Sequence, residues 1–272
     1  MIDVLHEERF MDKAPPAICA ALLDEGRYLC SSSTMYRFLN TLGEVKERRN
    51  QLRHPVYQKP ELLATAPNQV WSWDITKMKG PGKWNRYYLY VILDIYSRYA
   101  VGWMVATRES GELAKQLIEE TCNRQSIDRD QLIIHSDRGS PMKSKTVALL
   151  LTDLGVTKSF SRPRVSDDNP YSESQFKTIK GHHSLPERFC SIQDARARCN
   201  DLLNWYNNQH YHGGIALLPP YLVHHGGAAH CIAARQNVLT GAHAAHPERF
   251  VKGPPKALAL PDAVWINKPT EA

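Results

Sequence analysis

The spacing of apolar residues changes along the chain, and the N-terminal part has the spacing of helices. Residues 15–24 are mostly apolar and begin with two prolines, which suit the first turn of a helix. Residues 33–42 follow serines that are good N-caps, and Gly43 is placed to end this second helix. Two helices joined by a short glycine-containing turn are the layout of a helix-turn-helix, and a small helical packing module explains the same pattern.

From residue 70 the pattern becomes that of strands, because apolar and polar positions alternate. Trp71, Trp73 and Ile75 are predicted on one face of a strand, and Asp74 lies on the other face near its middle. The later segments predict strands at 86–95, 98–106, 132–137 and 156–160, and helices at 109–122, 142–154, from 170 onward and at 193–208. This order predicts an α/β domain with a mixed five-stranded sheet flanked by helices.

Changes in composition mark the predicted domain boundaries. Residues 46–66 are first charged and then contain several prolines, which indicates a linker. From Gly226 onward small residues, histidine and proline dominate, which indicates a poorly structured or extended tail. We therefore expect a helical region, a linker, an α/β core and a tail at residues 1–45, 46–66, 67–226 and 227–272.

The overall composition is that of a soluble globular protein, with 42% hydrophobic and 23% charged residues. No apolar run is long enough to span a membrane, and no signal peptide is visible, so we expect a soluble cytoplasmic protein. The six cysteines include no CxxC pair, which favours reduced thiols. Of the net charge of +6, much lies in residues 138–190, where nine Lys and Arg oppose five Asp and Glu. Such a basic field favours polyanions, including nucleic-acid backbones.

Three acidic residues occupy positions where a carboxylate is unusual. Asp74 lies inside a predicted strand, Asp137 ends another, and Glu173 lies in the first turn of a predicted helix. A carboxylate in a strand is costly unless it is paired, hydrogen-bonded or bound to a metal. Oxygen ligands without a Cys or His cluster suit Mg²⁺ or Mn²⁺. Two such ions about 3.5–4 Å apart can hold the attacking and leaving oxygens of a displacement at phosphorus.

The segments around these acids, WSWDIT, IIHSDRG and NPYSESQFKTIK, resemble the DDE triad of retroviral integrases and insertion-sequence transposases. Thirty-five residues separate Asp137 from Glu173, and Lys180 stands seven positions after Glu173, as in the integrase-like branch. Lys177 and Lys180 share a helix face with Glu173. The segments YLYVILDIYSRYAVGW, WYNNQHYHGGI and PERFVKGPPKALALPDAVWIN look like the second-frame transposase protein of such elements.

This resemblance implies an RNase H-like fold and metal-dependent DNA strand cleavage and transfer, with Mg²⁺ or Mn²⁺ as the cofactor, as two ions. It makes Asp74, Asp137 and Glu173 the catalytic metal ligands and Lys180 a contact to the element end. The implied partners are the element ends and target DNA, with further copies of the chain bound to that DNA. The zinc module of retroviral integrases and a long basic region with heptads are missing, so we also expect an upstream-frame partner protein.

The DNA-binding candidates outside the core are basic residues near the N-terminus. Arg37 lies near the start of the second predicted helix, where a recognition helix would contact base edges. Arg48, Arg49 and Arg53 belong to the predicted linker and are placed to lie along phosphates. With Lys177 and Lys180, these residues form the predicted DNA-binding set.

Several alternatives stay open at the level of sequence. A nuclease that cuts without joining, or a catalytically inactive DNA-binding remnant, would carry much of the same pattern. Asp167 or Asp168 could replace Glu173 as the third acid, and His135 is either a partner of the carboxylates or a core residue. Asp94 is interpreted as a hydrogen-bonding turn residue, and the C-terminal histidines as surface or packing residues rather than zinc ligands.

Overall fold

A computed structural model describes residues 1–10, 13–43, 59–139, 141–162 and 168–269. The chain divides into two compact units, Met1–Val56 and Tyr57–Ala272. The predicted arginines Arg48, Arg49 and Arg53 lie outside the described residues, as does Asp167.

The first unit is a small helical module with its own core. It contains α1 (Ile2–Leu5), the 3₁₀ helix η1 (Glu8–Phe10), α2 (Pro15–Asp24) and α3 (Ser32–Thr41). The last two confirm the predicted helices, and Ser31 caps α3 by accepting a hydrogen bond from the Thr34 backbone N–H at 3.3 Å. The buried side chains that hold the module together are Leu5, Phe10, Ile18, Leu22 and Met35.

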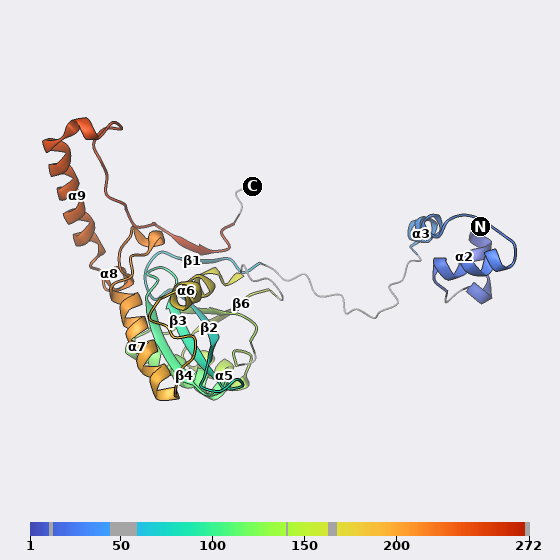
Figure 1. Cartoon of the computed structure of the whole chain (residues 1–272), viewed down its shortest axis with the longest axis horizontal. Coiled ribbons are helices and arrows are strands. Elements are labelled where there is room, and N and C mark those ends of the chain that lie inside the picture. Colours follow the sequence, from blue (N-terminus) through green and yellow to red (C-terminus); the bar gives the residue numbers. More distant parts are fainter. Residues whose placement is uncertain (11–12, 44–58, 140, 163–167, 270–272) are drawn as a thin grey trace. The chain divides into compact units, whose positions relative to one another are not determined.

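The second unit is built on a five-stranded mixed sheet with the strand order β4-β3-β2-β5-β6 (Figure 1). The strands are β2 (Val70–Lys79), β3 (Arg86–Asp94), β4 (Ala100–Ala106), β5 (Ile133–Ser136) and β6 (Thr157–Phe160). The first three pair antiparallel as a meander, while β5 and β6 run parallel to β2. This is the RNase H-like α/β arrangement that the sequence predicts.

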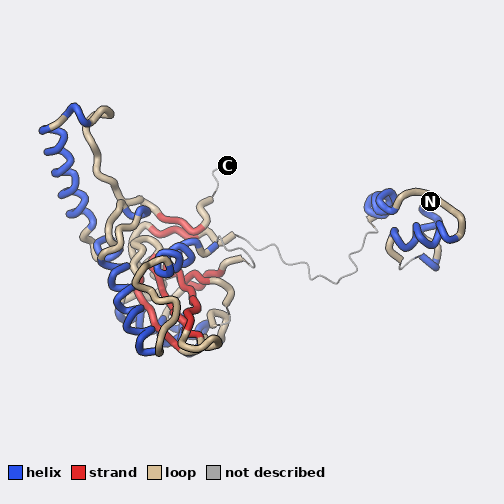
Figure 2. The backbone as a smooth tube through the Cα atoms, in the orientation of Figure 1, coloured by secondary structure: helices blue, strands red, loops and turns tan. Residues whose placement is uncertain are grey.

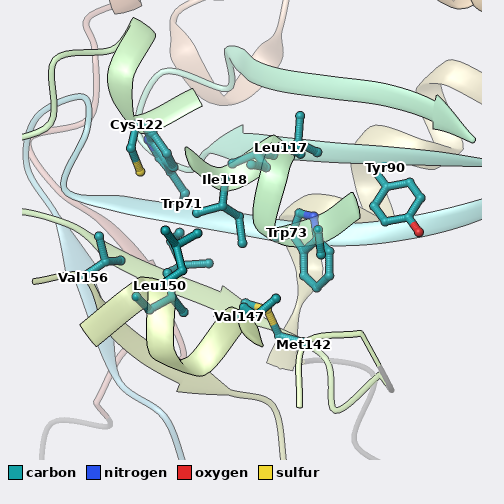
Figure 3. Close-up of a cluster of buried hydrophobic side chains, with 14 of the residues drawn as sticks. Trp71, Trp73, Tyr90, Leu117, Ile118, Cys122, Met142, Val147, Leu150 and Val156 are labelled. Atoms are coloured by element: carbon teal, nitrogen blue, oxygen red, sulfur yellow. The ribbon is translucent and has the colours of Figure 1, made fainter. Parts of the chain in front are cut away.

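Helices cover both faces of this sheet. On one face, α4 (Gly111–Arg124) and α5 (Lys145–Asp153) pack against Trp71 and Trp73 of β2 (Figure 3). On the other face, α6 (Pro170–Lys180) and α7 (Ile192–Asn208) pack against apolar side chains of β3 and β4. The alternation of apolar and polar residues along β2 therefore separates its two faces as predicted. Its tryptophans enter the core under α4 and α5, and its polar side chains lie on the side of α6.

The C-terminal part corrects the prediction of a poorly structured tail. The core continues through η3 (Gly213–Ile215) and α8 (Pro220–His224), and the predicted tail itself contains α9 (Ala228–Ala245) and η4 (Pro247–Arg249). After α9 the chain turns back and ends in β7 (Val264–Ile266), which pairs antiparallel with β1 (Leu62–Ala64) (Figure 2). Alanine favours helix even where apolar periodicity is weak, which explains α9. The predicted linker likewise contains a strand, since β1 lies within residues 46–66.

None of the helices in the described ranges is long and apolar enough to cross a membrane.

Candidate active site

Asp74 and Asp137 lie side by side because of the register between β2 and β5. Trp73 pairs with Ser136 in this parallel pair, so the next residue on each strand is one of the two acids. Both side chains are half-buried, and the Ile75 backbone N–H donates to Asp74 Oδ1 at 2.7 Å. Asp137 directly follows the carboxyl end of β5, the kind of position where α/β sheets collect ligands, and Asp74 stands beside it in the middle of β2. The sheet thus presents two carboxylates at one point.

Helix α6 brings Glu173 toward the same face of β2. The Ser72 hydroxyl bonds to the side chains of Asn169 and Ser172, which lie at the start of α6. Because Ser72 and Asp74 are two residues apart on one strand, they share a face, and Glu173 directly follows Ser172. Asn169 stands at the predicted N-cap position, but its side chain binds Ser72 instead of capping the helix.

The charges of the other two acids and of Lys180 reach the carboxyl group of Asp74. The pKa of Asp74 is raised to about 7, chiefly by burial, which outweighs the lowering effect of the Ile75 N–H. The negative charges of Asp137 and Glu173 contribute to this rise, and the positive charge of Lys180 acts against it. Residues that are distant in sequence, from β2, the end of β5 and both ends of α6, therefore influence the charge state of Asp74, and the assignment of the three acids as a triad stays a prediction.

Lys177 and Lys180 occupy the exposed face of α6 together with Glu173. Phe176 and Ile179, between them in sequence, are buried in the core under the helix. The predicted grouping of the three polar residues on one face is therefore confirmed.

A cavity of about 120 Å³ opens beside the aspartates and contains an acid that the sequence did not indicate. Its lining is Trp73, Asp74, Ile75, Glu109, Ser136, Asp137, Gly139 and Pro141. Glu109 comes from the segment between β4 and α4, and its carboxylate lies 3.9 Å from Lys77 Nζ. The loop is held by Tyr90, whose hydroxyl accepts from the Ser110 N–H and donates to the Arg108 carbonyl. No local pattern distinguishes Glu109 from a solvent-exposed acid near a helix start.

A buried hydrogen-bond chain orients Asp137. The Ser161 hydroxyl donates to Asp137 Oδ1 at 2.7 Å and lies 3.3 Å from His135 Nε2. That nitrogen also lies 2.8 Å from the Asp168 carbonyl, which only accepts, so Nε2 carries the proton. Burial lowers the pKa of His135, so the ring is neutral. His135 is therefore both a core residue and an indirect partner of the carboxylate, which unites the two interpretations of the sequence.

Asp168, one alternative for the third acid, is engaged elsewhere. Its carboxylate is completely buried and pairs with Arg162, whose Nε and Nη2 lie 2.9 and 3.0 Å from the two oxygens. Asn267 donates to it as well, at 2.9 Å. Burial acts to raise the pKa of Asp168, but the hydrogen bonds from Arg162 and Asn267 bring it down to about 2. This environment is that of a structural ion pair, and it favours Glu173 as the third acid.

The remaining candidates have structural roles. Asp94 is fully buried and accepts hydrogen bonds from the backbone of Asn68 and from Ser97, as expected of a turn residue. His224 bonds to Ser97 and Gln125 and stacks on Tyr99. Among the residues that the structure describes, no three His, Cys, Asp or Glu side chains are placed to hold a metal ion. The three acids thus influence one another electrostatically, but their carboxylates are not close enough together to form a ready metal site. Their hard oxygen donors and their mutual repulsion fit a divalent cation.

Comparison with known proteins gives the family. Two family models described as integrase core domain match residues 64–166 and 154–220. The transposase for insertion sequence element IS904 of Lactococcus lactis is 30% identical over 196 residues, which cover 72% of this chain and 74% of that protein. The chain belongs to the insertion-sequence transposases with an integrase core. Transposase InsF of insertion sequence IS3A from Escherichia coli is 29% identical over 161 residues, covering 59% of this chain and about half, 55%, of that relative.

Solved structures with a similar fold come from retroviral integrases. A chain of the simian T-cell lymphotropic virus intasome in complex with PP2A regulatory subunit B56 gamma matches with a TM-score of 0.48 and 18% identity, covering 76% of this chain and 70% of that one. The HTLV-2 integrase catalytic core domain in complex with magnesium matches with a TM-score of 0.45 and 18% identity, covering 59% and 98%.

Proposed function

We propose that this transposase cleaves DNA at the ends of its insertion sequence and joins the freed 3′-OH to target DNA. The observation that carries the proposal is the coupling of Asp74, Asp137 and Glu173 within an integrase-core fold. In the first step water attacks a phosphodiester and the 3′-oxygen leaves. In the second step that 3′-OH attacks a target phosphodiester, forming a new O–P bond while the 3′-oxygen of the target strand leaves. Because both steps are displacements at phosphorus, one set of residues serves both.

The cofactor of this proposal is Mg²⁺ or Mn²⁺, as two ions held by Asp74, Asp137 and Glu173. When bound, such ions stabilise charge on the attacking and leaving oxygens. The chain's own contribution is to place the acids: Ser161 orients Asp137, and the Ser72 contacts fix the start of α6. Lys180 adds a positive charge that suits a phosphate beside the scissile bond.

A strand-transfer assay with precleaved end duplexes and a target plasmid tests the function. Joined product supports a transposase. Cut product without joining would identify a nuclease, and DNA binding without either product would identify an inactive remnant. Mass measurement of the protein on end duplexes tests the proposed oligomer, and adding the product of the upstream frame tests whether that protein is a partner.

Lys180 is expected to contribute to end binding through a phosphate contact. Lys180→Ala should weaken binding to end duplexes modestly and reduce the slope of log K against log salt by about one unit. Lys180→Glu should weaken it more, because a negative charge then faces DNA. Anisotropy titrations across a salt series measure both effects, with Lys115→Ala on α4 as the exposed control. An unchanged slope for both variants would mean that Lys180 faces solvent only.

Arg37 is expected to contribute to sequence recognition through the N-terminal module. It is exposed on α3, where it donates to Thr34 at 3.2 Å. Arg37→Ala should weaken binding to element ends by about 5- to 150-fold and affect random duplexes less, because base-edge contacts carry specificity. Arg27→Ala, another exposed arginine of the module, is the control. Equal loss on specific and random duplexes would show that the module only packs or binds nonspecifically.

A further inference from the structure

The tip of the β2–β3 hairpin, residues 79–86, carries a large aromatic side chain that contributes little to the fold. Trp84 is 84% exposed, whereas Trp71 and Trp73 on the same hairpin are buried. Lys83 Nζ lies 5.5 Å from the centroid of the Trp84 ring, so a cation accompanies the aromatic face. A tryptophan this exposed gains almost nothing from burial within the chain, and it is a side chain suited to contacting a partner.

The hairpin tip is held in one conformation by hydrogen bonds. Gly80 and Asn85 bond across the turn, with the Gly80 N–H donating to the Asn85 carbonyl at 2.9 Å. Arg188 donates to the carbonyls of Gly80 and Gly82, each at 3.3 Å. The adjoining Phe189 N–H donates to the Lys79 carbonyl, and its ring is buried under α7. The exposure of Trp84 therefore follows from the fixed backbone conformation of the hairpin tip.

The charged residues of the hairpin itself are all of one sign. Residues 75–93 contain four Lys and Arg and no Asp or Glu. Lys77 and Lys79 are paired with acids from other segments, Glu109 and Glu187. Within the described part of the chain, Lys83 and Arg86 form no ion pair. An exposed aromatic ring beside unpaired cations matches the chemistry of a nucleic acid, in which phosphates accompany flat bases and sugars.

The position of the tip relative to the acids sets where it would meet DNA. Asp74 and Lys79 lie on the same strand, five residues apart, and the tip begins there. At about 3.3 Å per residue this corresponds to about 17 Å along β2, and Trp84 lies somewhat beyond. With a rise of about 3.4 Å per base pair, that reach corresponds to about 5–7 base pairs of duplex from the phosphate at the active site.

We propose that the β2–β3 hairpin tip is a DNA-binding element of this transposase, which contacts duplex about 5–7 base pairs from the scissile phosphate. Lys83 contacts a backbone phosphate, and the Trp84 ring packs against sugars and base edges in the groove. The inference rests on the proposed function, because its distance is counted from the DNA held at Asp74. It adds a site that lies outside the predicted DNA-binding residues.

Binding measurements on the full chain test the chemistry of the contact. Trp84→Ala should weaken binding to end duplexes about tenfold, and Trp84→Phe should restore most of it, since an aromatic–nucleotide contact is lost and regained. Lys83→Ala should lower the salt slope by about one unit. Leu149→Ala, which removes another exposed hydrophobic side chain, and Lys115→Ala on α4 are matched controls that should leave binding unchanged.

Crosslinking tests the position. With p-benzoylphenylalanine in place of Trp84, irradiation should give a DNA crosslink about 5–7 base pairs from the scissile phosphate. Unchanged binding by the Trp84 and Lys83 variants, or a crosslink to a second protein molecule alone, would overturn the proposal. Strand transfer by the wild-type chain separates this failure from failure of the proposed function, because joining would persist while the hairpin variants bound DNA normally.

Discussion

Replacing Asp74, Asp137 or Glu173 singly with alanine is expected to abolish both cleavage and joining while leaving DNA binding largely intact. Loss of a metal ligand removes several kcal/mol of transition-state stabilisation, so the rate should fall by at least about 10³-fold. The measurement is strand transfer and end cleavage in Mg²⁺, with binding followed separately. Asp201→Ala, an exposed acid on α7, is the matched control. Near-wild-type activity of any triad variant would remove that residue from the site.

The substitution Asp74→Asn should reveal the cost of ionising Asp74 in the absence of divalent cations. The pKa of Asp74 is raised to about 7, chiefly by burial and then by its acidic neighbours. A folded-state pKa above the unfolded value means that ionisation destabilises the fold, and this loss grows as pH rises from about 4 to about 7. Asp74→Asn should therefore unfold at a higher temperature than wild type at pH 8, with the difference vanishing below pH 4. A lower melting temperature at pH 8 would contradict the assigned environment.

Removing the C-terminal strand from residue 264 onward is expected to reduce strand transfer by at least about tenfold, although the strand is far in sequence from Asp74, Asp137 and Glu173. The Trp265 carbonyl accepts a hydrogen bond from Tyr171 at 2.7 Å. Asn267 donates to Asp168 at 2.9 Å and to the Pro60 carbonyl at 3.0 Å. The contacts with Tyr171 and Asp168 flank the start of α6, so we expect them to position Glu173. Each lost hydrogen bond costs about 1 kcal/mol, and two suffice for a tenfold effect.

Point variants separate positioning from general loss of stability. Tyr171→Phe removes the hydrogen bond to the Trp265 carbonyl and the one with Arg98, and it keeps the ring, which packs beside Val264 and Ile266. It should lower the rate at saturating DNA severalfold and leave DNA affinity and the far-UV circular dichroism spectrum unchanged. Leu258→Ala, an exposed residue of the same C-terminal region, should have no effect. Full activity of the truncated chain would show that α6 holds its position without β7.

Sequence alone determined the features that depend on local chemistry. The alternation around Asp74 predicted which side chains of β2 enter the core, and the serine and proline signals predicted the starts of α2, α3 and α6. The spacing between Asp137 and Glu173, together with the residues around them, also indicated the family. The assignment of the three acids as metal ligands stays a prediction, and the structure adds to it the electrostatic coupling of all three.

Only the tertiary structure decided the features that depend on partners far along the chain. The pairing of β7 with β1 has no periodic signal, and Asn267 meets Pro60 across 207 positions. The roles of acids were equally undecided, because Asp168 becomes a structural ion pair through Arg162, while Glu109 enters the active-site cavity through a loop held by Tyr90. A carboxylate's function depends on which charges and donors surround it, and in this fold those groups come from other strands and helices.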